Sequence, residues 1–326
     1  MLSRHQNVLI DALPDEGGPY YLSQGEKVFY PADAVRECAL LPLQGKESSA
    51  NKRAILLHGA PGSGKSYSGM KRLEELLEGD PDRARTTAII SYDEFGAIFD
   101  IQEYVAGLMK IDAGLHGQHA KSSRATLDAR RQHWLDFQPL SQFVRSKTLK
   151  CALAEEHDLY IDITSSGPGT IALIQLLEAL DYQDIEMWSY AAPYRMSAER
   201  IQQRPRPTSH EELLVKRVGA YDMLPRLLHY VHTLRVFMNE SDNVEPQEIA
   251  HFKMGHVHRC NPHYADSLLS MLADDAEDFF NATGGLPLSI KSTELVDRYA
   301  RAMRGFETMM KPVTDSAQPR PDMRFS

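Results

Sequence analysis

Cysteine is scarce in this sequence, and what is missing excludes several classes of protein. The three cysteines, Cys38, Cys151 and Cys260, are too widely spaced for a disulfide scaffold, so we expect a reducing, cytoplasmic setting. No apolar run approaches the ~20 residues of a membrane helix, and residues 1–14 lack the apolar core of a signal peptide. Lys and Arg number 36 against 45 Asp and Glu, and the net charge of -9 disfavours an extended nucleic-acid-binding surface.

The alternation of short apolar runs with helical patterns predicts an α/β fold. The predicted strands lie at 54–57, 87–90, 159–162, 185–191 and 234–238. The predicted helices lie at 65–78, 122–157, 170–180 and 197–203. Such alternation indicates a parallel sheet with helices on both faces. We expect a core over residues 51–245, an N-terminal extension over 1–50, a mainly helical C-terminal extension over 246–311 and a flexible tail over 312–326.

The strongest motif is a phosphate-binding loop. Residues 59–66 match the pattern G-x-x-x-x-G-K-[ST] in full, after a predicted strand and before a predicted helix. Glycines let such a loop curl so that its backbone N–H groups face a phosphate, which the helix N-terminus also favours. Lys65 would reach the β- and γ-phosphates, and the Ser66 hydroxyl would ligate Mg²⁺. The loop therefore predicts an ATP and Mg²⁺ site made of Gly59, Ala60, Pro61, Gly62, Ser63, Gly64, Lys65 and Ser66.

Other sequence features indicate which kind of nucleotide-binding protein this is. The chain has no Asn-Lys-x-Asp element, which a guanine-reading switch would use. The third predicted strand ends in Asp162-Ile163, not in the Asp-Glu pair of many mechanical ATPases. A kinase needs instead a base beside the acceptor hydroxyl and cations around the transferring phosphoryl group, and the sequence has candidates for both.

Two acidic residues at strand ends are candidates for the acceptor side. Asp93 follows the second predicted strand and Asp162 ends the third, so both should face the crevice that the phosphate loop shares. We expect Asp93 to accept the proton of the attacking hydroxyl, with a helix N-cap as the alternative. Asp162 is expected to bind Mg²⁺ or a substrate hydroxyl. Thr164 and Ser166 would line the acceptor pocket, with a polar strand-to-helix turn as the alternative.

An arginine cluster supplies the candidate cations. Arg200, Arg204 and Arg206 lie in a proline-containing stretch at the end of a predicted helix. Guanidinium groups bind phosphate bidentately and offset charge in the transition state. We expect Arg200 and Arg206 to belong to a lid over ATP, and the alternative is a solvated helix end.

Two further clusters are interpreted without a function. His251, His256, His258 and His263 lie close to Cys260, and this composition can bind Zn²⁺. Their spacing matches no closed pattern of paired ligands, so we favour loop and helix-end histidines over a metal site. The acidic run at 274–278 is expected to be a solvated helix face.

These motifs together resemble the zeta-toxin family of bacterial P-loop kinases. The resemblance covers about residues 50–245 and runs through the phosphate loop, 90–95, 159–167, 191–193 and the arginine cluster at 200–206. It implies a P-loop kinase core with a parallel sheet flanked by helices. It also implies that Asp93 is the general base, that Asp162 and Thr164 shape the acceptor site, and that Arg200 and Arg206 bind ATP phosphates.

Two departures bear on the acceptor. The family usually has Glu where Asp162 stands and often Arg near Ser166, and its usual acceptor is a UDP-linked amino sugar. The long region between Asp93 and Asp162 and the extra helices at both ends are more similar to the AvrRxo-type effector kinases of plant-pathogenic bacteria. Those are similar to zeta toxins and phosphorylate the adenosine ribose of NAD.

The resemblance therefore implies an ATP- and Mg²⁺-dependent kinase that phosphorylates a hydroxyl of a nucleotide-type metabolite, with the NAD ribose favoured. It implies a toxin, or an effector secreted into a host cell, and a small antitoxin or chaperone partner. Three alternatives stay open: a UDP-N-acetylglucosamine kinase, a polynucleotide kinase that acts on an oligonucleotide end, and a switch protein that turns over ATP without an acceptor.

Overall fold

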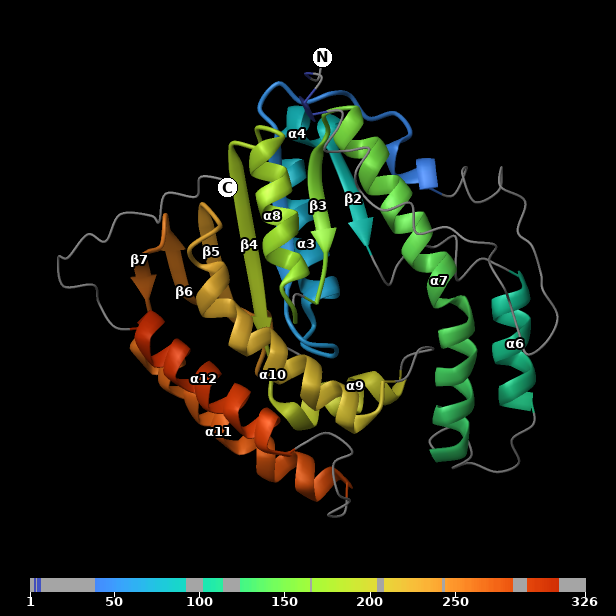
Figure 1. The fold of residues 1–326 in the computed structure, drawn as a ribbon, viewed down its shortest axis with the longest axis vertical. Helices are drawn as coiled ribbons and strands as arrows, with labels where there is room; N and C mark the ends of the chain where they lie inside the picture. Colours follow the sequence, from blue (N-terminus) through green and yellow to red (C-terminus); the bar gives the residue numbers. More distant parts are fainter. Residues whose placement is uncertain are drawn as a thin grey trace.

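A mixed seven-stranded sheet forms the centre of the computed structural model (Figure 1). The structure describes residues 3, 5–6, 39–91, 102–113, 124–164, 166–203, 208–241, 244–283 and 292–310. The sheet order is β2-β3-β1-β4-β5-β6-β7. Its first five strands are parallel, β6 pairs antiparallel with β5, and β7 pairs antiparallel with β6. The strands are β1 (Arg53–His58), β2 (Thr87–Ser91), β3 (Asp158–Asp162), β4 (Asp184–Ala191), β5 (Thr233–Met238), β6 (Gln247–Lys253) and β7 (His256–Cys260).

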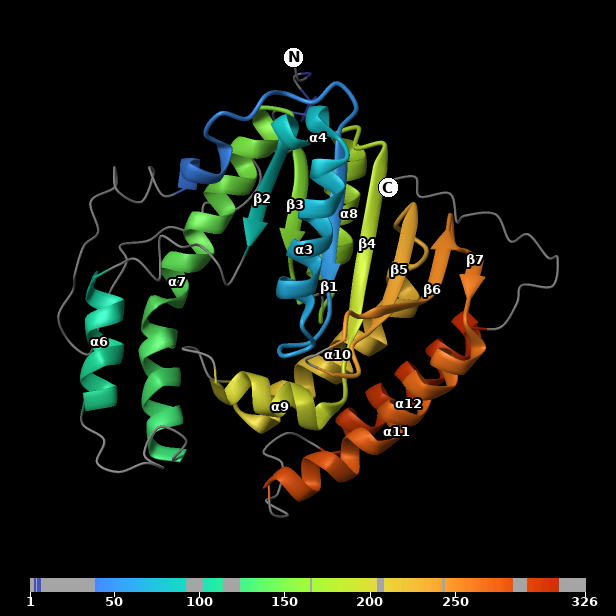
Figure 2. The same cartoon turned by 180° about the vertical axis from the view of Figure 1, so that it is seen from behind.

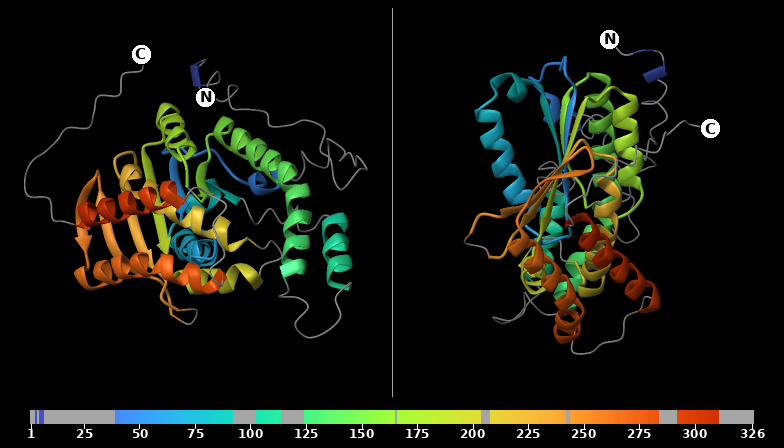
Figure 3. Two further views of the ribbon diagram at one scale, coloured as in Figure 1. Left: turned by 60° about the horizontal axis from the view of Figure 1, so that its bottom comes forward. Right: turned by 90° about the vertical axis from the view of Figure 1, so that its left-hand side faces the viewer.

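Helices cover both faces of this sheet, as Figures 1 and 2 show from opposite sides. Helix α3 lies on one face, and α7, α8 and α10 lie on the other, with α12 packed on α10 (Figure 3). The helices are α3 (Lys65–Glu78), α4 (Pro81–Thr86), α6 (Gln102–Ala113), α7 (Arg124–Ala154), α8 (Gly169–Ala179), α9 (Tyr194–Gln203), α10 (His210–Leu227), α11 (Pro262–Thr283) and α12 (Ser292–Met310), besides the short 3₁₀ helix η1 (Leu41–Leu43). None of the described helices is both long and apolar enough to cross a membrane.

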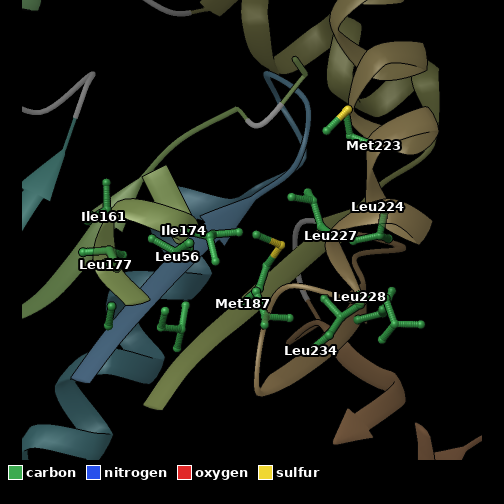
Figure 4. Close-up of a cluster of buried hydrophobic side chains, with 14 of the residues drawn as sticks. Leu56, Ile161, Ile174, Leu177, Met187, Met223, Leu224, Leu227, Leu228 and Leu234 are labelled. Carbon is green, nitrogen blue, oxygen red and sulfur yellow. The ribbon is translucent and has the colours of Figure 1, made fainter. Parts of the chain in front are cut away.

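Strand β1 shows why these residues form a central strand. Ile55 and Leu57 point to the α3 face and pack with Leu73, whereas Leu56 points to the α8 and α10 face and packs with Met187 (Figure 4). A parallel strand between two helical layers must be apolar on both sides, which a continuous apolar run satisfies. The five predicted strands and the predicted helices at 65–78, 170–180 and 197–203 are confirmed within a few residues, and so is the α/β class.

The sheet extends beyond the last predicted strand. Residues 247–260, which the sequence analysis assigned to a mainly helical extension, form the hairpin β6–β7 at the edge of the sheet. Met254 and Gly255 connect the two strands with positive φ angles of 51° and 80°. A two-residue turn of this kind usually carries Asn-Gly or Asp-Gly, so Met-Gly gives little signal in the sequence. The helices expected after residue 260 are present as α11 and α12.

Helix α10 has no counterpart among the predicted elements. It is buried on several sides because it lies between the sheet and α12, and it therefore lacks the apolar stripe that reveals a surface helix. Pro225 lies inside its last turn and adds a second feature that argues against a helix in the sequence.

Candidate nucleotide-binding site

The phosphate-binding loop connects the end of β1 to the start of α3. Gly62 and Gly64 have φ angles of +78° and +85°, a region that favours glycine. A Cβ atom at Gly62 would lie 2.4 Å from the Ser197 carbonyl oxygen, and one at Gly64 would lie 2.3 Å from Asn239 Nδ2. The glycines of the motif are therefore required both by the backbone conformation and by the neighbours that pack against the loop.

The N-terminus of α3 is suited to an anion. The helix begins at Lys65, and Gly64 before it has no side chain to cap the first N–H groups. No acidic side chain lies in the first turn. The positive end of the helix dipole therefore faces the loop without a competing carboxylate from its own turn.

Three predicted site residues meet at one carboxylate. Lys65 Nζ donates to Asp162 Oδ1 at 2.5 Å, and Ser66 Oγ donates to Asp162 Oδ2 at 2.5 Å. Asp162 ends β3 beside Leu57 of β1, which brings it next to the loop that follows β1. Lys65 and Asp162 are buried, at 7% and 3% exposure. A hydroxyl beside a carboxylate is an oxygen pair of the kind that Mg²⁺ prefers, so these residues fit the predicted ion.

Arg200 reaches the same loop from α9. Its Nη1 donates to the Gly62 carbonyl oxygen at 3.0 Å, and its Nη2 lies 3.5 Å from Asn239 Oδ1. Asn239 in turn donates from Nδ2 to the Ser63 carbonyl oxygen at 3.2 Å. The structure thus joins the predicted arginine to the predicted loop. Asn239 was missed by the sequence analysis, although a polar residue directly after a strand is a signal that could have identified it.

His58 lies beneath the loop as a neutral side chain. Its Nε2 donates to the Ala220 carbonyl oxygen at 3.1 Å, because a carbonyl can only accept, and its Nδ1 then accepts from Ser189 Oγ at 2.8 Å. Complete burial lowers the pKa of His58 to about 4; the hydrogen bond to Ala220 opposes this, and the charge of Lys65 adds to it. The residue before the loop therefore carries no charge near neutral pH.

A cavity of about 540 Å³ lies on the α7 and α8 side of the sheet. Thr164 and Ser166 both line it, as the sequence analysis expected for an acceptor pocket. Its other walls come from the ends of β2 and β3, from α7, and from the starts of α8 and α10 (Figure 1). Because Thr164 is two residues after Asp162, the Cα atom of this lining residue lies at most about 7 Å from that of the aspartate that contacts Lys65 and Ser66.

The lining of this cavity is cationic and partly aromatic. Arg131, Arg145 and Lys216 contribute positive charges, Glu212 contributes one negative charge, and Trp134 contributes an indole ring. Glu212 Oε2 accepts from Arg131 at 3.1 Å, and Glu212 Oε1 lies 2.7 Å from Lys216 Nζ. Burial raises the pKa of Glu212, but Lys216 and Arg131 outweigh it and leave this pKa below its ordinary value. Among the described residues that line the cavity, positive charges outnumber negative ones, in a chain whose net charge is -9.

Two predicted site residues, Asp93 and Arg206, lie outside the described part of the chain, so their roles remain predictions. The histidine cluster is spread over β6, β7 and the start of α11, and His251 and His258 are in edge-to-face contact with ring centres 4.9 Å apart. Within the described residues, no group of three or more His, Cys, Asp or Glu side chains could hold a metal ion.

The prediction of a solvated acidic face at 274–278 is wrong at one position. Asp275 is completely buried, because Arg217 of α10 pairs with it through two hydrogen bonds. Asp274 and Glu277 are exposed, as expected. The sequence gives no indication of the exception, since a single acid in an acidic run reveals its partner only when the helices are packed together.

Comparisons with known proteins find similarity only among solved structures. No family model matches the chain, and no curated protein matches it. A chain from the PezAT chromosomal toxin-antitoxin system of the human pathogen Streptococcus pneumoniae is 13% identical, with a TM-score of 0.49 over 86% of this chain and 98% of that chain. The AvrRxo1-ORF1:-ORF2 crystal structure with ATP has 14% identity and a TM-score of 0.46 over 86% and 83%.

The AvrRxo1-ORF1:AvrRxo1-ORF2 structure with sulphate ions has 16% identity, with a TM-score of 0.46 over 86% of this chain and 83% of that chain. The similarity assigns no role to any residue.

Proposed function

We propose that this chain is an ATP- and Mg²⁺-dependent kinase that phosphorylates a hydroxyl of a nucleotide-type metabolite, with the NAD adenosine ribose as the favoured acceptor, and that it acts as a bacterial toxin or effector. One observation carries the proposal: Lys65 and Ser66, at the end of the phosphate-binding loop, both donate hydrogen bonds to Asp162. Phosphoryl transfer depends mainly on positioning and on offsetting charge, and this arrangement supplies a cation, a hydroxyl and a carboxylate for both tasks.

On the donor side, each group has a defined task. The backbone N–H groups of the loop and the start of α3 bind the phosphates, and Lys65 exchanges its contact with Asp162 for the β- and γ-phosphate oxygens. Ser66 and Asp162 would then hold Mg²⁺, which would supply positive charge to offset the charge of the phosphates. Arg200, held at Gly62 and Asn239, adds a second cation within reach of the transferring group.

On the acceptor side, the cavity supports a nucleotide-type substrate. Trp134 and the apolar ends of β2 and β3 suit a planar base, while Arg131, Arg145 and Lys216 suit the phosphates that such a molecule carries. Ile90 lines the cavity three residues before Asp93, so at most about 11 Å of chain connects the proposed base to the pocket. Asp93 would accept the proton of the attacking hydroxyl.

The sequence resemblance adds a proposed partner, a small antitoxin or chaperone that binds this protein. Copurification of the chain with the product of an adjacent gene, followed by an activity measurement on the complex, would test that part of the proposal independently of the acceptor.

The experiment that tests the proposed function is an acceptor assay with mass detection. The purified protein is incubated with ATP and Mg²⁺ and with either NAD or UDP-N-acetylglucosamine, and the acceptor is examined for the mass of one added phosphate. We expect a phosphorylated product with NAD, and none with an Asp93→Asn variant. Absence of product from both acceptors, with wild type and variant alike, would contradict the proposal.

Two arms of the same experiment address the alternatives. A labelled oligonucleotide in place of the metabolite detects a polynucleotide kinase through phosphate at its end. A phosphate-release measurement without any acceptor detects a switch protein, for which ATP turnover would not respond to NAD. A product only with UDP-N-acetylglucosamine would keep the kinase and change its acceptor.

A further inference from the structure

A buried ion pair links α11 to α10, the helix whose Ala220 carbonyl oxygen contacts His58 at the start of the phosphate-binding loop. Arg217 of α10 and Asp275 of α11 are both fully buried, and Arg217 donates from Nε and Nη2 to the two carboxylate oxygens at 2.9 and 2.7 Å. The remaining terminal nitrogen, Nη1, donates to the Ala192 carbonyl oxygen at 2.8 Å and to Ser197 Oγ at 3.1 Å. Ala192 directly follows β4, and Ser197 lies in the first turn of α9.

The backbone of Ser197 also packs against the phosphate-binding loop. A Cβ atom at Gly62 would lie 2.4 Å from the Ser197 carbonyl oxygen and 2.8 Å from its Cα atom, so the two backbones are packed as closely as glycine permits. One helical turn later, Arg200 donates to the Gly62 carbonyl oxygen. Helix α9 therefore touches the loop at two points, and its first turn is held from behind by Arg217. Helix α11 contacts α9 directly as well (Figure 3).

The chemistry of the Arg217–Asp275 pair indicates that it orients neighbouring groups more than it stabilises the fold. Replacing a buried ion pair by well-packed apolar residues is often neutral or stabilising, so stability alone does not explain why the pair is present. The guanidinium fork is planar, and pairing two of its nitrogens with one carboxylate fixes the direction of the third. That third nitrogen points at Ala192 and Ser197, which are the start of the segment that supports the loop.

We propose that Arg217 and Asp275 are positioning residues of the nucleotide site, which hold α9 so that Ser197 and Arg200 fix the phosphate-binding loop. The proposal rests on the proposed function and extends its machinery to α11, outside the predicted kinase core. It makes Asp275 a determinant of nucleotide affinity, although nothing places it in contact with the nucleotide.

The test replaces the pair without leaving a buried charge. An Arg217→Met, Asp275→Leu double variant keeps apolar packing and loses the two hydrogen bonds to Ala192 and Ser197. Calorimetric titration with a non-hydrolysable ATP analogue and Mg²⁺ measures the Kd, and urea unfolding measures stability. We expect the Kd to rise about tenfold, because the charge-assisted hydrogen bonds that hold α9 against the loop are lost, while the free energy of unfolding stays near that of wild type.

The matched control is the pair of Asp222 and Arg301, which joins α10 to α12 with Nε–Oδ1 at 3.2 Å; the Arg301 side chain is 43% exposed, whereas the Arg217 side chain is fully buried. An Asp222→Asn, Arg301→Gln variant should bind the analogue with the wild-type Kd. In the transfer assay, the Arg217→Met, Asp275→Leu variant should raise the KM for ATP more than it lowers kcat, whereas a purely structural role would change stability and leave KM unchanged.

A wild-type Kd in the folded double variant would overturn the proposal. If the double variant does not fold, Ser197→Ala decides, because it removes only the hydroxyl that Arg217 contacts: a Kd raised by about threefold supports the proposal, and an unchanged Kd overturns it. Failure of the proposed function has a different signature. Binding of the analogue would still depend on the Arg217–Asp275 pair, but the transfer assay with ATP would give no phosphorylated metabolite; this result excludes the proposed acceptor and keeps the positioning role. Absence of analogue binding by wild type overturns both.

Discussion

Two buried ion pairs in this molecule, Lys65–Asp162 and Arg217–Asp275, differ in their surroundings. The first has a cation that can change partners, whereas the second has a fixed geometry. Asp162 shares its two oxygens between Lys65 and the hydroxyl of Ser66, at the mouth of the phosphate-binding loop. Both carboxylate oxygens of Asp275 accept hydrogen bonds from the guanidinium of Arg217. The remaining nitrogen of Arg217 donates to the Ala192 carbonyl oxygen and to the Ser197 hydroxyl. An ammonium is a compact charge on a flexible stem that can change partners, whereas a bidentate guanidinium fixes a geometry.

The comparison teaches that burial of a charge pair does not by itself indicate its role. The Lys65 pair lies beside the phosphate-binding loop, where we propose that a triphosphate binds, so its cation could exchange one anion for another. The Arg217 pair lies between α10 and α11, where protein groups take its hydrogen bonds, so it can transmit position but cannot exchange.

The largest effect should come from breaking the first pair. Lys65→Ala should lower kcat for phosphoryl transfer by about 10³- to 10⁵-fold, because a cation on the transferring phosphate is lost. The measurement is the rate of product formation with ATP and the acceptor proposed above. Lys71→Ala is the matched control, since Lys71 lies on the same helix and is exposed, and its rate should remain near wild type. A Lys65→Ala rate within tenfold of wild type would mean that the loop does not act on the γ-phosphate.

Breaking one side of the second pair should damage stability instead. Asp275→Ala leaves the charge of Arg217 buried without its carboxylate, which should cost about 3–5 kcal/mol in the free energy of unfolding. Urea unfolding followed by circular dichroism measures the loss. The double variant Arg217→Met, Asp275→Leu should recover most of it, because it removes both charges. A loss below about 1 kcal/mol for Asp275→Ala would show that water or another group compensates the arginine.

The two pairs also show how far the sequence predicts this molecule. The phosphate-binding loop, its strand and its helix were predictable because loop conformation, phosphate contact and helix start are encoded within eight consecutive residues. Asp162 was predictable because the carboxyl ends of parallel strands meet at one edge of the sheet. Arg217 and Asp275 are 58 residues apart, in a helix without an apolar stripe and in an acidic run, so only the packing of α10 against α11 reveals them.

The same limit applies to the hairpin β6–β7 and to the cavity. The hairpin has a turn of unusual composition, and the cavity is formed by α7, α8 and α10 together with two strand ends. Thr164 and Ser166 were predicted as pocket residues from their place after β3. The cations that give the pocket its charge come from α7 and α10, and no local pattern connects those residues with β3.

A third buried group, His58, extends the comparison because it is neutral near pH 7, whereas the two ion pairs hold buried charges. Burial lowers its folded-state pKa from 6.5 to about 4, with Lys65 nearby adding to the shift. Between these values the unfolded chain binds more protons than the folded chain, so stability should fall as the pH decreases from about 6.5 to about 4, by on the order of 3 kcal/mol.

Urea unfolding at about pH 5 and about pH 7.5 measures this dependence. His58→Gln provides the comparison, because an amide can donate to Ala220 and accept from Ser189 but does not titrate. The variant should lose less stability between the two pH values than wild type does, whatever its absolute stability. Equal losses in both proteins would mean that other histidines cause the pH dependence.

The smallest effect should come from the pair of Asp222 and Arg301, which joins α10 to α12 and is partly exposed. Arg301 is 43% exposed and contacts Asp222 at 3.2 Å, so water screens the attraction and the long side chain loses freedom on pairing. Arg301→Gln should therefore lower the free energy of unfolding by only about 0.2–1 kcal/mol, and 1 M salt should remove most of that difference. The Asp275→Ala loss should persist in the same salt, because the buried pair is barely screened. If salt reduced both losses equally, the Arg217 pair would not be shielded from solvent. The contrast between a rigid pair and an exchangeable pair would then be wrong.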